Sequence, residues 1–193
     1  MSQMKYRTRL ILLMVLSASA LNACVSTRVT STKVGPTAQP LERAALVVKT
    51  GRFASSNTAG SLGQRNLDSL VPNLITRLPV VFTLNGIPAR SVVSTSAAAD
   101  PLSIIKLESN EKLIVLTPVS ATYSSRGGQA LVVEAELIDT VRKPPVWRAE
   151  IRLATLGFGK FDQKVADDVA SQLLDKLRSD GIARIPDGPI RTQ

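Results

Sequence analysis

Apolar and polar residues alternate along three consecutive segments in the second half of the chain. The apolar positions are Leu113, Val115, Val119, Ala121 and Tyr123 in the first segment, Leu131, Val133, Ala135 and Leu137 in the second, and Trp147, Ala149, Ile151 and Leu153 in the third. A period of two predicts strands that bury one face. Gly127 and Gly128 favour a turn after the first segment, and a loop with Pro144 and Pro145 precedes the third. We therefore expect an antiparallel three-stranded meander.

The apolar pattern also predicts the register of the last two strands. Pairing Leu137 with Trp147 places every apolar side chain of this hairpin on one face, and a shift of one residue would expose them. In the same register Leu131 pairs with Leu153. The opposite face then carries the charged residues Glu134, Glu136, Arg148, Glu150 and Arg152. Exposed pairs of this kind contribute about 0.2–1 kcal/mol each, so this face indicates a solvated sheet surface more than a catalytic site.

Trp147 is the only tryptophan of the chain. Its place in the apolar alternation predicts a core residue. The alternative is a partner-binding anchor, because tryptophan is enriched among the residues that dominate binding at protein interfaces.

Two longer segments show the three- and four-residue spacing of helices with one buried face. The first has apolar residues at Leu67, Leu70, Val71, Leu74, Ile75 and Leu78 and continues through Val81, Phe82 and Leu84. The second has them at Phe161, Val165, Val169, Leu173 and Leu177, widened by Ala166, Ala170 and Leu174. Asp162 is a suitable N-cap for the second helix, while Pro72 and Pro79 disturb the first. Each helix is expected to end at a glycine, Gly86 or Gly181, and to lead into a short strand, at 87–93 and 182–185 respectively.

The remaining segments complete a single domain over residues 42–186. Residues 42–49 predict the first strand, residues 51–63 a polar loop, and residues 101–107 a short helical segment. We expect an α/β or α+β sandwich in which two main helices pack on a mixed sheet that contains the antiparallel meander. Residues 24–41 are rich in Ser, Thr, Val and Lys without a sustained period, which predicts a flexible tether. A short strand around Val29 is the alternative. Residues 187–193 are expected to form a C-terminal tail.

The N-terminal residues have the layout of a secretory signal. Residues 5–9 contain Lys5, Arg7 and Arg9 and no acidic residue, residues 10–16 are apolar, and residues 17–20 are small. The apolar stretch is shorter than the roughly 20 residues that a transmembrane helix needs. Residues 1–23 are therefore expected to be a signal peptide that is removed.

This segment ends in Leu21-Asn22-Ala23-Cys24, which resembles the lipobox of bacterial lipoproteins. The leucine and the small residue before the cysteine match, whereas Asn22 departs from the usual small or β-branched residue. The resemblance implies cleavage between Ala23 and Cys24, a diacylglyceryl group on the Cys24 sulfur, and an acyl chain such as palmitate on the new amine. The alternative is an ordinary signal peptide cut at Ala20 or Ala23, which would leave a free thiol.

Several acyl chains on one residue anchor a protein stably to a membrane. In Gram-negative lipoproteins, aspartate directly after the cysteine resembles an inner-membrane retention signal, and this chain has Val25 there. The resemblance therefore implies a lipid anchor in the outer membrane, with the domain in the periplasm.

Residue usage limits the chemistry of the domain. The chain of 193 residues has no histidine and one cysteine, which excludes histidine-based acid–base catalysis, His/Cys zinc sites and internal disulfides. Nucleotide-binding, zinc-protease and serine-hydrolase motifs are absent, and the adjacent Asp167 and Asp168 point about 100° apart around a helix. We therefore expect no catalytic residue, no metal and no cofactor. A serine–lysine nucleophile pair stays open, because spatial contacts do not follow from the sequence.

The charge of the mature domain is moderately basic. The whole chain has a formal charge of +9, and removal of Lys5, Arg7 and Arg9 with the signal segment leaves +6. Such a charge can favour anionic lipid or glycan surfaces. The chain lacks dense Lys/Arg runs interleaved with aromatic residues, so nucleic acid is not expected as a partner.

The order of elements resembles the periplasmic α/β domains of envelope lipoproteins, such as the curli-secretion lipoprotein and the penicillin-binding-protein activator lipoproteins. The resemblance covers about residues 42–185 and rests on element order alone. We expect a non-catalytic module that binds an unidentified envelope protein or further copies of itself. Two alternatives stay open: a periplasmic hydrolase that acts on peptidoglycan or another glycan, and a basic binder of anionic lipid or glycan.

Overall fold

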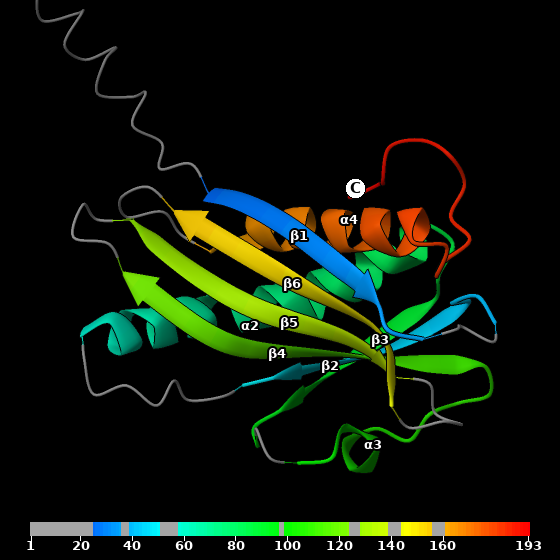
Figure 1. Ribbon diagram of the computed structural model, residues 1–193, viewed down its shortest axis with the longest axis horizontal. Helices are drawn as coiled ribbons and strands as arrows, with labels where there is room; N and C mark the ends of the chain where they lie inside the picture. The colour runs from blue at the N-terminus through cyan, green and yellow to red at the C-terminus, as the bar shows by residue number, and fades with distance from the viewer. Residues whose placement is uncertain are drawn as a thin grey trace, which may run out of the picture.

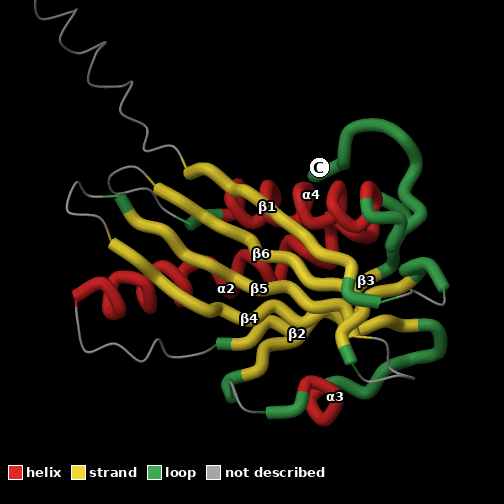
Figure 2. The backbone as a smooth tube through the Cα atoms, viewed as in Figure 1, coloured by secondary structure: helices red, strands yellow, loops and turns green. Residues whose placement is uncertain are grey.

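The computed structural model describes residues 25–35, 39–50, 58–96, 99–123, 128–138, 144–155 and 161–193. These ranges form a six-stranded mixed sheet with two long helices, α2 (Thr58–Leu84) and α4 (Gln163–Ser179), on one face (Figures 1 and 2). The strands are β1 (Val25–Lys33), β2 (Arg43–Lys49), β3 (Ala89–Ser94), β4 (Glu111–Tyr123), β5 (Gln129–Ile138) and β6 (Pro145–Thr155), in the spatial order β1-β6-β5-β4-β2-β3. The expected fold class, a mixed sheet with two main helices packed on it, is confirmed.

The predicted meander is formed by β4, β5 and β6. β5 and β6 pair antiparallel, with Leu137 opposite Trp147 and Leu131 opposite Leu153, as predicted. β4 pairs antiparallel with β5, whereas β2 runs parallel to both β3 and β4. The predicted register is thus confirmed for the hairpin in which each strand buries one face.

β4 departs from the predicted single buried face. Leu113 and Val115 belong to a small second core, while Ile114 and Leu116 belong to the main core. A strand that is covered on both sides has a continuous apolar run in place of an alternating one. The cover on the second face is α3 (Pro101–Ile104) with the residues that follow it. A β-bulge at Pro118 then shifts the register of the strand.

The predicted flexible tether is wrong over much of its length, because Val25–Lys33 forms β1. This strand pairs antiparallel with β6 along its whole length and is one edge of the sheet. Val25 and Val29 pack on the main core. The polar side chains of Ser26, Arg28 and Thr30, at alternate positions of the strand, are exposed. The folded domain therefore begins one residue after Cys24 and not at residue 42. Cys24 itself and the predicted signal segment lie outside the described residues.

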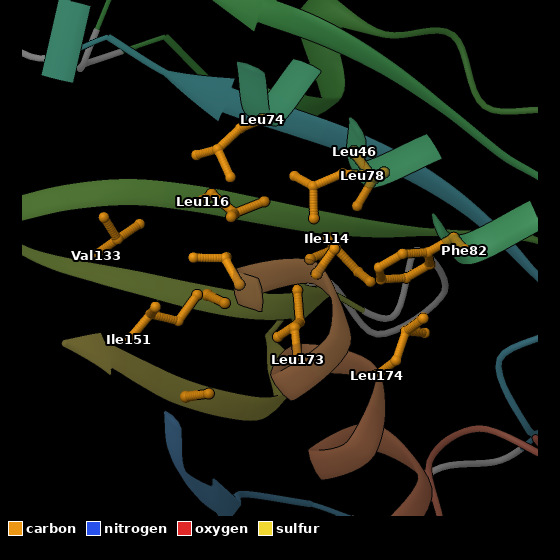
Figure 3. Packing of buried hydrophobic residues seen from close by; sticks show 14 of the residues in the cluster. Leu46, Leu74, Leu78, Phe82, Ile114, Leu116, Val133, Ile151, Leu173 and Leu174 are labelled. Atoms are coloured by element: carbon orange, nitrogen blue, oxygen red, sulfur yellow. The ribbon is translucent and has the colours of Figure 1, made fainter. Parts of the chain in front are cut away.

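α2 includes both prolines of the predicted helix. Pro72 is exposed and Pro79 half-buried, whereas Leu70, Leu74 and Leu78 are buried on the sheet. The helix begins at Thr58, inside the predicted loop 51–63, and residues 51–57 lie outside the described part of the chain. Figure 3 shows how leucines of α2 and α4 meet over the strands in the main core.

Both helices end in the same geometry. Gly86 and Gly181 have φ angles of 85° and 68°, which favour glycine. The N–H groups of Ile87 and Ile182 donate to carbonyls five residues earlier, at 3.0 and 2.8 Å. These bonds complete Schellman motifs, so the predicted glycine stops are confirmed.

The segments that follow the two glycines differ. The first leads into β3, close to the predicted strand 87–93. The second makes only an isolated bridge between Ala183 and Leu41, so the predicted strand 182–185 is wrong. The predicted C-terminal tail lies against the domain, because the Arg191 N–H donates to Asn85 Oδ1 at 3.0 Å and Arg77 donates to the Thr192 carbonyl at 2.5 Å.

Candidate functional site

The residues predicted to carry function are not brought together. Ala23 and Cys24 lie outside the described residues. Trp147 is fully buried in the main core, which confirms the core prediction. In this structure the Trp147 side chain does not reach the surface, so it is not available as a partner-binding anchor.

Trp147 and Ser31 meet at Asp180, the C-cap of α4. The Trp147 Nε1–H donates to Asp180 Oδ2 at 2.7 Å, and the Ser31 hydroxyl donates to the same oxygen at 2.5 Å. Burial raises the pKa of Asp180, but these hydrogen bonds and the positive charge of Lys176 lower that pKa by more, so it lies below its ordinary value. The carboxylate thus joins β1, β6 and α4.

The outer edge of β1 offers backbone groups that no other described strand uses. Gln172 Nε2 of α4 donates to the Thr27 carbonyl at 3.0 Å, so this carbonyl points away from β6. In an antiparallel pair, the direction of the backbone groups alternates along the strand. Val29 and Ser31 therefore also direct their N–H and C=O groups outward, and these groups have no hydrogen-bond partner among the described residues.

An open groove of about 430 Å³ lies beside this edge, between β1 and the second half of α4. It is lined by Val29, Gln172, Asp175, Lys176, Arg178 and Ser179. A groove between an edge strand and a helix can accept an extended peptide, which adds a strand to the sheet and places alternate side chains in the groove. We call Val29–Lys33 with these α4 residues the edge groove.

The charge around the edge groove is mostly positive. The β1 part of the groove carries Lys33 and no acidic residue, and Lys33 forms no ion pair within the described ranges. On α4, Arg178 pairs with Asp175 at 2.6 Å, which leaves Lys176, with a 3.9 Å contact to Asp180, as the more available cation. This arrangement favours acidic side chains on a bound peptide.

The edge groove has only a weak signal in the sequence. β1 has two apolar residues on its buried side, Val25 and Val29, because an edge strand needs less cover than a central one. The alternation of valine with Ser and Thr was the available signal, and it is typical of a half-solvated strand.

The face of the sheet opposite α2 and α4 has a second hollow, of about 300 Å³. It is lined by Thr30, Ser31, Thr32, Glu134, Glu136, Arg148, Ala149 and Glu150. Arg148 donates to Glu136 at 2.8 Å, and Glu150 lies 3.4 Å from Arg152. The acids of a glycan hydrolase are held in a cleft that shifts their pKa values apart. These glutamates lie on an exposed sheet surface beside arginines, so the hollow favours a solvated charged face.

A buried carboxylate, Glu111, lies at the start of β4, outside both hollows. Glu111 accepts hydrogen bonds from Arg90 at 2.9 and 2.7 Å and from the Glu108 N–H at 2.8 Å. The Arg90 hydrogen bond lowers the pKa of Glu111 by more than burial raises it. The cluster connects β3, β4 and the loop before β4, which is a structural role.

The described residues contain no metal cluster and one long apolar helix. Across the described ranges, no group of three or more Asp, Glu, Cys or His side chains could hold a metal ion. One helix among them, Gln64–Leu84 within α2, has the length and apolar character of a membrane span. Leu67, Leu70, Leu74 and Leu78 of this helix are buried in the main core, as expected of a core helix.

Comparison with known proteins gives distant structural likenesses alone. No protein-family model matches the chain, and no curated protein matches it. Two structures of the PelC dodecamer from Paraburkholderia phytofirmans are 17% and 18% identical, with TM-scores of 0.44 and 0.46, and cover 82% of this chain and 99% of theirs. A putative neuraminyllactose-binding hemagglutinin homolog from Helicobacter pylori is 7% identical, with a TM-score of 0.31, over 77% of this chain and 92% of its own. Likenesses at this level assign no function to the chain.

Proposed function

We propose that this protein is a lipid-anchored envelope protein that acts by binding an extended segment of another envelope protein in the edge groove. The observation that carries the proposal is the outward-facing backbone of Val29 and Ser31 beside the groove on α4. The anchor is the lipid on Cys24 that the lipobox resemblance implies. Binding by strand addition needs no catalytic group.

The edge of β1 is only partly closed by the protein itself. Gln172 covers the Thr27 carbonyl, and the edge from Val29 onward is left open next to the half-buried Val29 side chain. Natural proteins usually protect such edges, because exposed strands pair with other chains. An edge that is protected at one end and lined by a groove at the other therefore favours a specific partner.

The partner segment has a defined chemistry. Backbone hydrogen bonds to Val29 and Ser31 supply affinity, an apolar side chain fits beside Val29, and acidic side chains pair with Lys33 and Lys176. A further copy of this chain is the other candidate occupant, since an edge strand of one copy can pair with an edge strand of the next.

Cross-linking in the native envelope tests this function. A photoreactive amino acid replaces Lys33, which is exposed at the end of β1. As a positional control, the same amino acid replaces Glu108, which is exposed before β4 and pairs with Arg43 of β2. We expect one discrete cross-linked protein from position 33 and none from position 108. Mass spectrometry then separates an envelope partner from a second copy of the chain.

A matched pair of variants ties the cross-link to the strand edge. Val29→Pro removes the outward N–H but no bond to β6, and proline is tolerated at edge positions of this kind. Val29→Ala keeps the N–H. We expect Val29→Pro to abolish the cross-link and Val29→Ala to retain it. A cross-link that survives Val29→Pro, or recovery of glycan or lipid without protein, contradicts the proposed function.

The anchor is tested separately. Cys24→Ser should prevent incorporation of radiolabelled palmitate and release the protein from the membrane fraction. A variant that stays membrane-bound and is processed normally would show that the lipoprotein interpretation is wrong.

A further inference from the structure

β1 leaves almost no spacer between the proposed lipid and the folded domain. The strand begins at Val25, one peptide bond after Cys24, and consecutive Cα atoms are about 3.8 Å apart. This inference rests on the lipid anchor proposed above. A lipid on Cys24 would hold the start of β1 at the membrane surface, since the chain between them has no length to extend.

The register of the sheet shows which other residues lie at the same level. Val25 lies opposite Thr155, Thr155 opposite Gln129, and Gln129 opposite Tyr123. Figure 1 shows the start of β1, the end of β6, the start of β5 and the end of β4 at one end of the molecule, with the beginning of α2. Because the sheet is continuous, anchoring β1 brings these four strand ends to the same membrane surface.

Side chains at this end have the chemistry of a membrane–water interface. Tyr123 ends β4 with 46% of its surface exposed. Tyrosine is enriched at membrane surfaces because its ring is apolar and its hydroxyl is polar. Arg65 of α2 is exposed at the same end, next to Asn66, which donates a hydrogen bond to Gln129 of β5. Guanidinium groups form strong hydrogen bonds with phosphate oxygens.

We propose that the end of the domain with Val25, Arg65 and Tyr123 rests on the bilayer surface, with the strands pointing away from it. Tyr123 lies at the level of the lipid headgroups, and Arg65 pairs with their phosphates. A strand rises about 3.4 Å per residue, so Lys33 lies roughly 27 Å farther from the membrane than Val25. The edge groove then faces sideways, about 14–27 Å above the lipid, where a second membrane-associated protein can reach it.

Single-cysteine labelling tests this placement. Acylation of Cys24 leaves the chain without another thiol, so an introduced cysteine is labelled alone. Thr122→Cys tests the proposed contact end and leaves Tyr123 in place. Val34→Cys, at a residue with 52% exposure just after β1, tests the far end, and Thr30→Cys tests the open sheet face. Each lipidated variant carries a nitroxide and is reconstituted into phosphatidylethanolamine–phosphatidylglycerol vesicles.

Collision rates of the nitroxides with oxygen, which concentrates in the bilayer, and with a water-soluble nickel complex give the result. We expect the label at position 122 to collide more often with oxygen than with the nickel complex. We expect the labels at positions 34 and 30 to collide more often with the nickel complex. A membrane signal at 30 would mean that the domain lies on its open sheet face. Aqueous signals at all three positions in protein that sediments with vesicles would refute the placement while leaving the anchor intact. If the purified protein carries no acyl chain and does not sediment with vesicles, both the proposed lipid anchor and the proposed placement are wrong.

Discussion

At the scale of single residues, Asp180 connects Ser31 of the edge groove to Trp147 of the main core. It accepts hydrogen bonds from the buried Trp147 indole and from Ser31, and it caps α4. The sequence placed Trp147 in the core through its alternation, but it could not show the acceptor of the indole N–H. That acceptor lies 33 residues away along the chain and is brought in by the packing of α4 on β6.

Asp180→Ala should lower the free energy of unfolding by about 1–3 kcal/mol, because it leaves the buried Trp147 N–H without an acceptor. Urea denaturation followed by Trp147 fluorescence measures the change. Asp175→Ala is the control, since it removes an exposed pair with Arg178 and should cost at most about 1 kcal/mol. Equal losses in the two variants would show that the Trp147–Asp180 bond does not stabilise the fold.

The lowered pKa of Asp180 also predicts a dependence of stability on pH. A carboxyl with a lower pKa in the folded state stabilises the fold fully above its unfolded pKa, near 4, and loses this contribution as the pH falls through the folded value. Asp180→Asn should therefore be less stable than the parent protein at pH 6, and the difference should shrink below about pH 4. Denaturation curves at several pH values, compared for the two proteins, measure this; a constant difference would contradict it.

At the scale of elements, the strength of the apolar pattern decided what the sequence could predict. The hairpin of β5 and β6 has one fully buried face, and its register follows from the sequence. α4 has a continuous apolar stripe and an N-cap at Asp162, whose side chain accepts from the Val165 N–H at 3.2 Å. β1 was predicted as a linker, with a short strand around Val29 only as an alternative. Its polar residues are as frequent as those of a linker, and its pairing with β6 spans more than 100 residues of chain.

Amide hydrogen exchange should separate the inner and outer edges of β1. The N–H groups of Arg28, Thr30 and Thr32 point toward β6 and should exchange slowly. Those of Val29 and Ser31 point outward and should exchange rapidly. NMR exchange on the soluble Cys24→Ser protein measures both sets. Rapid exchange at all five positions would mean that the segment behaves as the tether that its composition suggests.

At the scale of the whole molecule, the place where the fold begins determines how the protein stands on a membrane. A flexible tether over residues 24–41 would have let the domain move away from the lipid in any orientation. The structure uses Val25–Lys33 as an edge strand, so one element connects the proposed anchor and the edge groove. The sequence predicts the lipid anchor and the order of the elements. It does not show the distance between the anchor and the folded domain, because this distance depends on whether β1 pairs with β6.

An inserted spacer should uncouple the anchor from the orientation of the domain. About ten Gly/Ser residues, preceded by a valine, are placed between Cys24 and Val25 and should span roughly 17 Å as a flexible chain. The lipidated protein should still sediment with vesicles, but the nitroxide at Thr122→Cys should shift from oxygen toward the nickel complex. The same insert after Gln193 is the control and should leave the label at the bilayer surface. If the spacer variant keeps its membrane signal at position 122, then Tyr123 and Arg65 hold the domain on the bilayer without a short linkage, and the missing spacer is not what sets the orientation.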